Sequence, residues 1–117
     1  MSLVSVILAG GLASRLEPLS SNFLPKQFLP LCDDGSSLYQ DSLRRSLELT
    51  TDIVVVSNES YVEIIESQTA SLYPVENINF IFEPENKNTS AAIAVALEYI
   101  SKFYKQNTKI LVLPSDH

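Results

Sequence analysis

The chain of 117 residues contains only one cysteine and one histidine, so it is poor in the side chains that most often bind zinc or form disulfides. An internal disulfide and a zinc site built from Cys and His ligands are both excluded. Such sparse cysteine use is typical of a reducing compartment, and we expect a cytoplasmic protein. His117 is the last residue and offers Cys32 no predicted catalytic base, so we interpret Cys32 as a packing residue.

Positive charge and long apolar runs are also scarce. Eight Lys and Arg residues stand against fourteen Asp and Glu residues, which disfavours binding to the phosphate backbone of a nucleic acid. The longest apolar run, residues 91–97, is far shorter than the roughly 18 residues of a membrane-spanning helix, and no basic region precedes the first apolar stretch. We expect neither a nucleic-acid nor a membrane partner, and a single domain over residues 1–117.

Four short apolar runs predict β-strands. They are rich in Val, Ile, Leu and Phe, and they cover residues 3–8, 52–57, 77–82 and 109–113. Because these runs are apolar almost throughout, we expect a mostly parallel sheet with helices on both faces. The predicted fold class is α/β, a Rossmann-like three-layer α/β/α arrangement with strand order 3-2-1-4.

The segments between these strands predict helices with recognisable starts. Ser37, with Gln40 three residues later, forms the pattern of a capping box for a helix that ends near Leu49. The second helix is expected to be capped by Ser57 or Asn58, and the third by Thr89.

The predicted strand order places a switch point between the first and fourth strands, and ligands of such sheets bind at this place. The loop after the first strand carries Gly10, Gly11 and Arg15, and the turn after the fourth strand carries Asp116. Glycines let backbone amides approach a phosphate, arginine donates a fork of N–H groups, and aspartate can hold Mg²⁺. Together they predict a nucleoside-triphosphate site.

Each of these features has a plainer interpretation when it is taken alone. The Gly10-Gly11 pair fits neither a dinucleotide fingerprint nor a P-loop and can form an ordinary tight turn. Arg15, Lys26 and Asp116 can be ordinary surface charges. A dinucleotide-binding Rossmann domain is disfavoured because its glycine fingerprint is missing, whereas the convergence of the loops favours a triphosphate site.

Four segments resemble those of the sugar-phosphate nucleotidyltransferase family, in the order in which the family has them. They are VILAGGLASRLEPLS (residues 6–20), LPKQFLPL (residues 24–31), FEPENKNTSAAIA (residues 82–94) and LVLPSDH (residues 111–117). The segments resemble the glycine-rich phosphate loop, the lysine signature, the loop that faces the base and the metal-binding turn. The fold that this resemblance implies is the one predicted from periodicity.

The resemblance also implies a role for each matching residue. Arg15 and Lys26 would be the catalytic cations that stabilise charge on the phosphates, and Asp116 would hold Mg²⁺. The residues expected to bind the nucleotide are Ala9, Gly10, Gly11, Ser14, Arg15 and Lys26 at the phosphates, and Glu83, Asn88 and Thr89 at the base. A carboxylate suits guanine, which presents two hydrogen-bond donors. Simple helix capping is the plainer role for Asn88 and Thr89.

The implied reaction transfers a guanylyl group from GTP to mannose 1-phosphate and releases pyrophosphate. Family members continue well beyond the segment at residues 111–117, so we expect this chain to hold the nucleotide-binding half of the site. The alternative is a non-catalytic fragment or remnant that binds nucleotide or only self-associates. The apolar run at residues 110–113 predicts an open sheet edge, and we expect a homo-oligomer that covers it.

Overall fold

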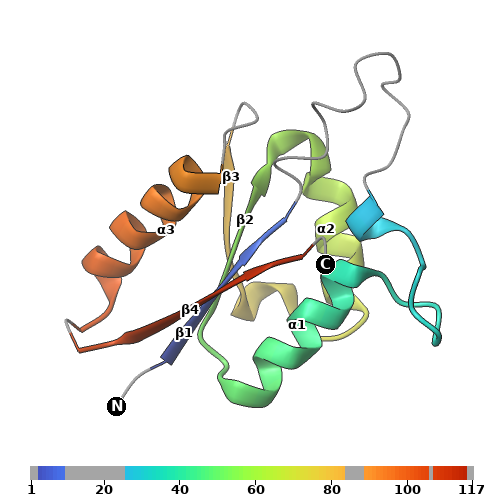
Figure 1. Cartoon of the computed structure of the whole chain (residues 1–117), viewed down its shortest axis with the longest axis horizontal. Coiled ribbons are helices and arrows are strands. Elements are labelled where there is room, and N and C mark those ends of the chain that lie inside the picture. The colour runs from blue at the N-terminus through green and yellow to red at the C-terminus, as the bar shows by residue number, and fades with distance from the viewer. Residues whose placement is uncertain (1–2, 10–25, 84–88, 106, 116–117) are drawn as a thin grey trace.

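Four parallel strands form the centre of the molecule in the order β3-β2-β1-β4 (Figure 1). The computed structural model describes residues 3–9, 26–83, 89–105 and 107–115, with the backbone alone for residues 89–92. The strands are β1 (Leu3–Leu8), β2 (Ile53–Asn58), β3 (Asn79–Glu83) and β4 (Lys109–Pro114). The predicted order and parallel arrangement are confirmed, and the predicted ends lie within one or two residues of those observed.

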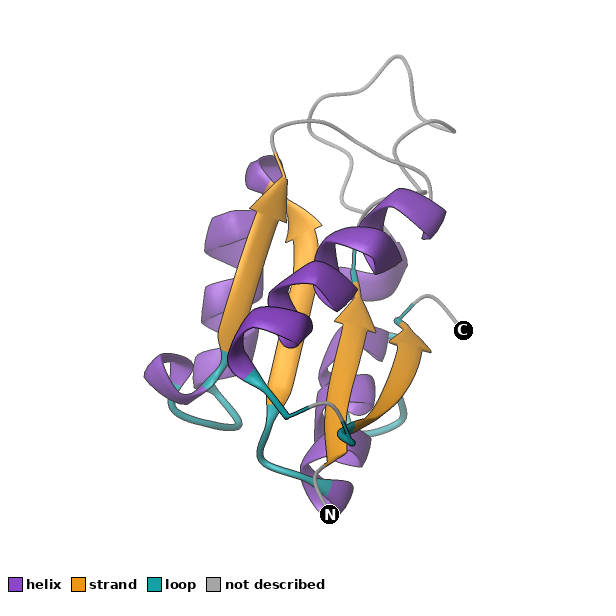
Figure 2. Ribbon diagram, turned by 90° about the vertical axis from the view of Figure 1, so that its left-hand side faces the viewer, coloured by secondary structure: helices purple, strands orange, loops and turns teal. Residues whose placement is uncertain are grey.

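Three α-helices cover the two faces of the sheet (Figure 2). They are α1 (Leu38–Leu49), α2 (Val62–Ala70) and α3 (Thr89–Phe103). Three single turns of 3-10 helix lie between them: η2 (Lys26–Phe28), η3 (Glu59–Tyr61) and η4 (Val75–Asn77). The helices α1 and α2 pack on one face and α3 packs on the other, which confirms the three-layer arrangement.

The start of α1 is the capping box that the sequence predicts. The Ser37 hydroxyl accepts a hydrogen bond from the Gln40 N–H at 3.1 Å, and the Gln40 side chain accepts one from the Ser37 N–H at 3.0 Å. The prediction for the second helix is wrong in detail, because Asn58 accepts the Ser60 N–H and caps η3, so that α2 begins only at Val62. The third helix includes Thr89 as its first residue instead of starting after it.

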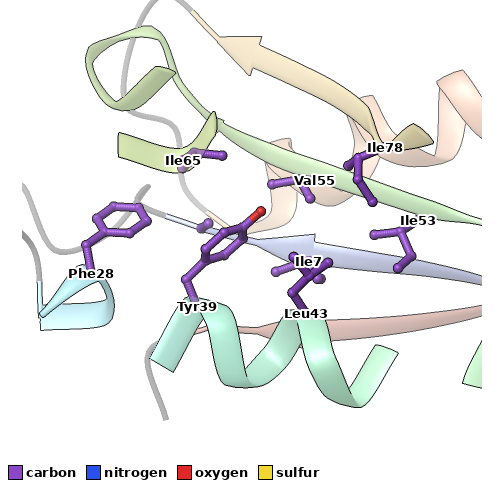
Figure 3. Packing of buried hydrophobic residues seen from close by; sticks show 9 residues of the cluster. Ile7, Phe28, Tyr39, Leu43, Ile53, Val55, Ile65 and Ile78 are labelled. Atoms are coloured by element: carbon purple, nitrogen blue, oxygen red, sulfur yellow. The ribbon is translucent and has the colours of Figure 1, made fainter. Parts of the chain in front are cut away.

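Alternate residues of β1 and β2 supply two hydrophobic clusters, one on each face of the sheet. The cluster under α1 and α2 includes the buried side chains of Ile7, Phe28, Tyr39, Leu43, Ile53, Val55 and Ile65 (Figure 3). The cluster under α3 includes Val4, Val6, Val54, Val56, Ala96 and Ile100. Since burying one such large side chain is worth about 1.5–3 kcal/mol, these two clusters hold the central strands in place.

The two edge strands are less covered than the two central ones. Residues of β3 are mostly half-buried, and Ile110 of β4 is 38% exposed. Cys32, which lies after η2, is a half-buried free thiol with its Sγ 3.7 Å from the Ser37 carbonyl oxygen, and its surroundings agree with a packing role. Among the described residues, no helix is long and apolar enough to cross a membrane.

Candidate functional site

The carboxyl ends of all four strands lie at one end of the sheet (Figure 2). At this end β1 and β4 are neighbours, with Leu8 opposite Pro114 in the parallel register. These are the two strands on either side of the switch point, since β2 continues the sheet from the other side of β1. The geometry therefore places a candidate ligand site where the chain leaves β1 and β4.

Three segments distant in sequence meet at Ser115. The Ser115 N–H donates to the Leu8 oxygen at 3.1 Å, and the Ser115 Oγ lies 3.0 Å from the same oxygen. The Ser115 hydroxyl also donates to the Gln27 Oε1, although the two residues are 88 positions apart. Both side chains are buried, Ser115 being 1% exposed and Gln27 3% exposed. The end of β1, the turn after β4 and η2 are thus joined by hydrogen bonds.

The single helical turn η2 presents Lys26 to solvent because its two other residues are anchored. The Phe28 ring is 2% exposed and packs against Tyr39 and Tyr61, with ring centroids 6.0 and 5.5 Å away. The Phe28 carbonyl accepts a hydrogen bond from the Gln68 Nε2 at 3.0 Å. Lys26 therefore extends from a fixed backbone at the carboxyl end of the sheet.

A charged cluster fixes the segment that follows η2. Asp34 accepts hydrogen bonds from the Ser36 hydroxyl at 2.6 Å and the Ser36 N–H at 3.0 Å, and it forms an ion pair with Arg44 at 3.1 Å. Together, these contacts lower the pKa of Asp34 to about 2. The segment between η2 and α1 is therefore tied to α1.

Ala9 contributes little that a ligand could contact. Its side chain is 1% exposed and belongs to the cluster under α1 and α2. Its N–H donates to the Val56 oxygen at 2.9 Å, which continues the β1–β2 ladder by one residue. The carbonyl of Ala9 is the one remaining polar group through which this residue could bind nucleotide.

Two residues of the predicted base loop are described, and both lie at the end of the sheet where the strands end (Figure 2). Glu83 is the last residue of β3, pairs in register with Asn58 and is 8% exposed. Within the described part of the chain, no group donates a hydrogen bond to its carboxylate. Thr89 begins α3, the helix on the face of the sheet opposite α1 and α2. The structure brings Ala9 and η2 together, and it separates both from Glu83 by the width of β2.

Six predicted site residues lie outside the described residues: Gly10, Gly11, Ser14, Arg15, Asn88 and Asp116. The described ranges contain no group of three or more His, Cys, Asp or Glu side chains that could hold a metal ion. A site with one carboxylate still suits Mg²⁺, which commonly binds one or two carboxylates together with substrate phosphates and water. The predicted donor set therefore fits a magnesium ion that arrives with its nucleotide.

Sequence reasoning assigned no role to Gln27 and Ser115, although both stand inside the segments that carry the resemblance. A glutamine and a serine in polar loops suggest solvent exposure, and nothing local indicates that they meet. Their positions give the available signal, because Gln27 directly follows Lys26 and Ser115 directly precedes Asp116.

Comparison with known proteins gives consistent matches over nearly the whole chain. A family model described as nucleotidyl transferase matches residues 4–117. The mannose-1-phosphate guanylyltransferase of Escherichia coli is 40% identical over 116 residues, which is 98% of this chain and 25% of that protein. The enzyme of the same name from Sinorhizobium fredii is 35% identical, over 98% of this chain and 22% of that protein. The chain spans about a quarter of the length of these relatives.

Solved structures with the same fold include two proteins of mannose phosphate chemistry. A mannose-1-phosphate geranyltransferase from Thermus thermophilus matches with a TM-score of 0.74 and 26% identity, over 99% of this chain and 32% of that one. A mannose-6-phosphate isomerase from Helicobacter pylori matches with the same TM-score and 25% identity, over 99% of this chain and 39% of that one.

Proposed function

The chain belongs to the nucleotidyl transferase family, and we propose that it forms the nucleotide-binding part of a mannose-1-phosphate guanylyltransferase. The reaction joins GTP and mannose 1-phosphate to give GDP-mannose and pyrophosphate. Residues 1–117 act in this proposal as one domain, incomplete relative to its relatives. A cytoplasmic location is part of the proposal and agrees with the single, free cysteine.

One observation carries the assignment of the site. The end of β1 and the η2 turn with Lys26 are both hydrogen-bonded to Ser115, in the turn after β4. These are the segments from which the glycine-rich loop, the lysine and the metal-binding aspartate extend. Their junction supports a single triphosphate site at the switch point.

The proposed mechanism needs no protein nucleophile. An oxygen of mannose 1-phosphate attacks the α-phosphorus of GTP, and the bond from this phosphorus to the β-bridging oxygen breaks, so that pyrophosphate leaves with the electron pair. The backbone at Gly10, Gly11 and Ser14 binds the phosphates, while Arg15 and Lys26 stabilise the charge that develops on them. Catalysis then consists of positioning and electrostatic stabilisation.

The proposed metal would be held by Asp116 and by the nucleotide. When bound, Mg²⁺ supplies charge neutralisation at the phosphate oxygens. At the other end of the nucleotide, Glu83 is 8% exposed, and no described group donates a hydrogen bond to its carboxylate, so this carboxylate can accept hydrogen bonds from guanine. Asn88 and Thr89 complete the proposed base side.

Pyrophosphate release tests the reaction, and calorimetric binding of Mg-GTP tests the site. We expect Mg-GTP to bind more tightly than Mg-ATP. Lys26→Ala should weaken binding about tenfold or more, because a charge-assisted hydrogen bond is worth about 1.5–3 kcal/mol. Lys102→Ala is a matched control, since Lys102 is an exposed lysine in the last turn of α3. If Lys26→Ala and Lys102→Ala bind Mg-GTP equally well, Lys26 does not contact the phosphates and its assignment to the site is wrong.

The assay also separates the proposal from its alternative. Pyrophosphate release that depends on mannose 1-phosphate would mean that the chain catalyses the transfer by itself. Binding of Mg-GTP without turnover supports a non-catalytic nucleotide-binding fragment. A chain that binds no nucleotide and only self-associates would contradict the proposed function.

We also propose that two copies of the chain associate through β4. In the described part of the chain, β4 pairs with β1 alone, and Ile110 is exposed at its edge. An open edge of this kind can pair with the same strand of a second copy across a twofold axis. Light scattering at high micromolar concentration should give the mass of two chains, and Ile110→Lys should give one. A parent mass of one chain, with freely exchanging amides at 110–113, would contradict this association.

A further inference from the structure

The buried contact between Gln27 and Ser115 links the two segments that carry the proposed phosphate and metal ligands. Gln27 directly follows Lys26, and Ser115 directly precedes Asp116. This hydrogen bond between two side chains therefore joins the residue next to Lys26 to the residue next to Asp116, although the two are 88 positions apart. We propose that Gln27 and Ser115 are positioning residues that hold Lys26 and Asp116 toward the same triphosphate.

The hydrogen bonds around Ser115 assign its hydroxyl to this contact. The Ser115 N–H donates to the Leu8 oxygen at 3.1 Å, so this carbonyl has a donor without the hydroxyl. The single hydroxyl proton is then available to Gln27 Oε1. Because both side chains are almost fully buried, neither can exchange this partner for bulk water without opening the site.

The two ends of the contact are held to different degrees. The η2 end has further anchors in the Phe28 ring and the Phe28 carbonyl. The turn after β4 is held, among the described residues, through the backbone and side chain of Ser115. Breaking the contact should therefore release the Asp116 side of the site while η2 stays in place.

This inference rests on the proposed function, and it makes the effect depend on magnesium. A loosened turn weakens the hold of Asp116 on Mg²⁺ and leaves the contact of Lys26 with the phosphates. Loss of binding should thus be larger for Mg-GTP than for GTP in the presence of a chelator. A contact with a merely structural role would weaken both forms equally.

The test compares Ser115→Ala, Gln27→Met and the double variant of the 117-residue chain by calorimetry with Mg-GTP and with metal-free GTP. We expect each single variant to weaken Mg-GTP binding about tenfold, the effect of one lost hydrogen bond between buried groups. The double variant should bind Mg-GTP about as tightly as whichever single variant binds it less tightly, because both single changes remove the same hydrogen bond. Urea unfolding of each variant serves as a control, since a cooperative unfolding transition shows that the variant is folded.

Ser46→Ala is the matched control. It also deletes a buried hydroxyl that hydrogen-bonds across elements, at 2.6 Å to Ser5 of β1, but this pair lies away from the strand ends. The control should keep the Mg-GTP affinity of the parent. The positioning role is refuted if the Ser115 and Gln27 variants bind Mg-GTP as tightly as the control. It is also refuted if the losses of binding free energy in the two single variants add in the double variant, or if binding of metal-free GTP is weakened as much as binding of Mg-GTP. A parent chain that binds no nucleotide refutes the proposed function itself, which separates the two failures.

Discussion

The hydroxyl of Tyr39 should be a measurable link between α1 and α2. It lies 2.7 Å from the Thr69 Oγ1, and both residues are fully buried. Tyr39→Phe leaves the threonine hydroxyl without this partner, and Thr69→Val leaves the tyrosine hydroxyl without it. Each change should cost about 1–3 kcal/mol, whereas the double variant removes both polar groups and should cost clearly less than the sum.

Tyr39 should also make the free energy of unfolding depend on pH. Burial raises the pKa of Tyr39 from 10.0 to about 12. The unfolded chain therefore loses this proton above pH 10 while the folded chain keeps it, so the contribution is present below pH 10 and is lost as the pH rises toward 12. The full loss is about 2.7 kcal/mol, and about half of it should appear by pH 11.

Urea unfolding of the parent and of Tyr39→Phe at pH 8 and pH 11 measures both effects. All other residues are common to the two proteins, so the difference between their free energies of unfolding isolates the contribution of Tyr39. This difference should shrink by about 1.4 kcal/mol at pH 11. Tyr73→Phe is the control, because no described residue hydrogen-bonds to the hydroxyl of the half-buried Tyr73, whose N–H donates to the Thr69 oxygen and is unaffected by the change. Additive single effects would refute the hydroxyl link, and a difference that does not change with pH would refute the role of burial.

Four further substitutions test the core and the site. Phe28→Leu should lower stability by about 1 kcal/mol through its lost ring contacts and also weaken Mg-GTP binding, measured by urea unfolding and calorimetry. Phe80→Leu in the edge strand β3 is the control and should lower stability without weakening Mg-GTP binding. If Phe28→Leu and Phe80→Leu both weaken Mg-GTP binding, the anchoring of η2 by Phe28 is not the cause. Ser57→Ala should leave stability unchanged or raise it in urea unfolding, because the buried Ser57 Oγ has no described partner; a clear loss would contradict this. Ser37→Ala should cost about 1 kcal/mol in the same assay by removing the α1 cap, and an unchanged midpoint would contradict this role.

The fold was largely predictable because its strongest local signals agree with one another. The Val and Ile runs of β1 and β2 are buried on both faces, and this explains why they are apolar without alternation. Ser37 and Gln40 form a local pattern that requires no tertiary information. The start of α2 was not predictable in the same way, because Asn58 accepts an N–H two residues on in front of either a 3-10 turn or an α-helix.

The site could be predicted only in part, for a physical reason. Lys26 was predicted as a site residue because its neighbours resemble a known signature; the structure places it on an anchored turn, and its role stays a prediction. Gln27 and Ser115 were missed because their meeting depends on the pairing of β1 with β4, which brings residues 88 positions apart into contact. No local propensity encodes such a contact.

A different signal could have located the site from the sequence. In β2 the first four residues are apolar, and the last two, Ser57 and Asn58, are buried and polar. The last residue of β3 is the buried Glu83, and the buried Ser115 directly follows β4. Buried polar groups cost stability, so their collection at the carboxyl ends of three strands is a local departure from a stable core. Such departures gather at functional sites, and polar residues that close predicted apolar strands therefore indicate the same end of the sheet as the topology does.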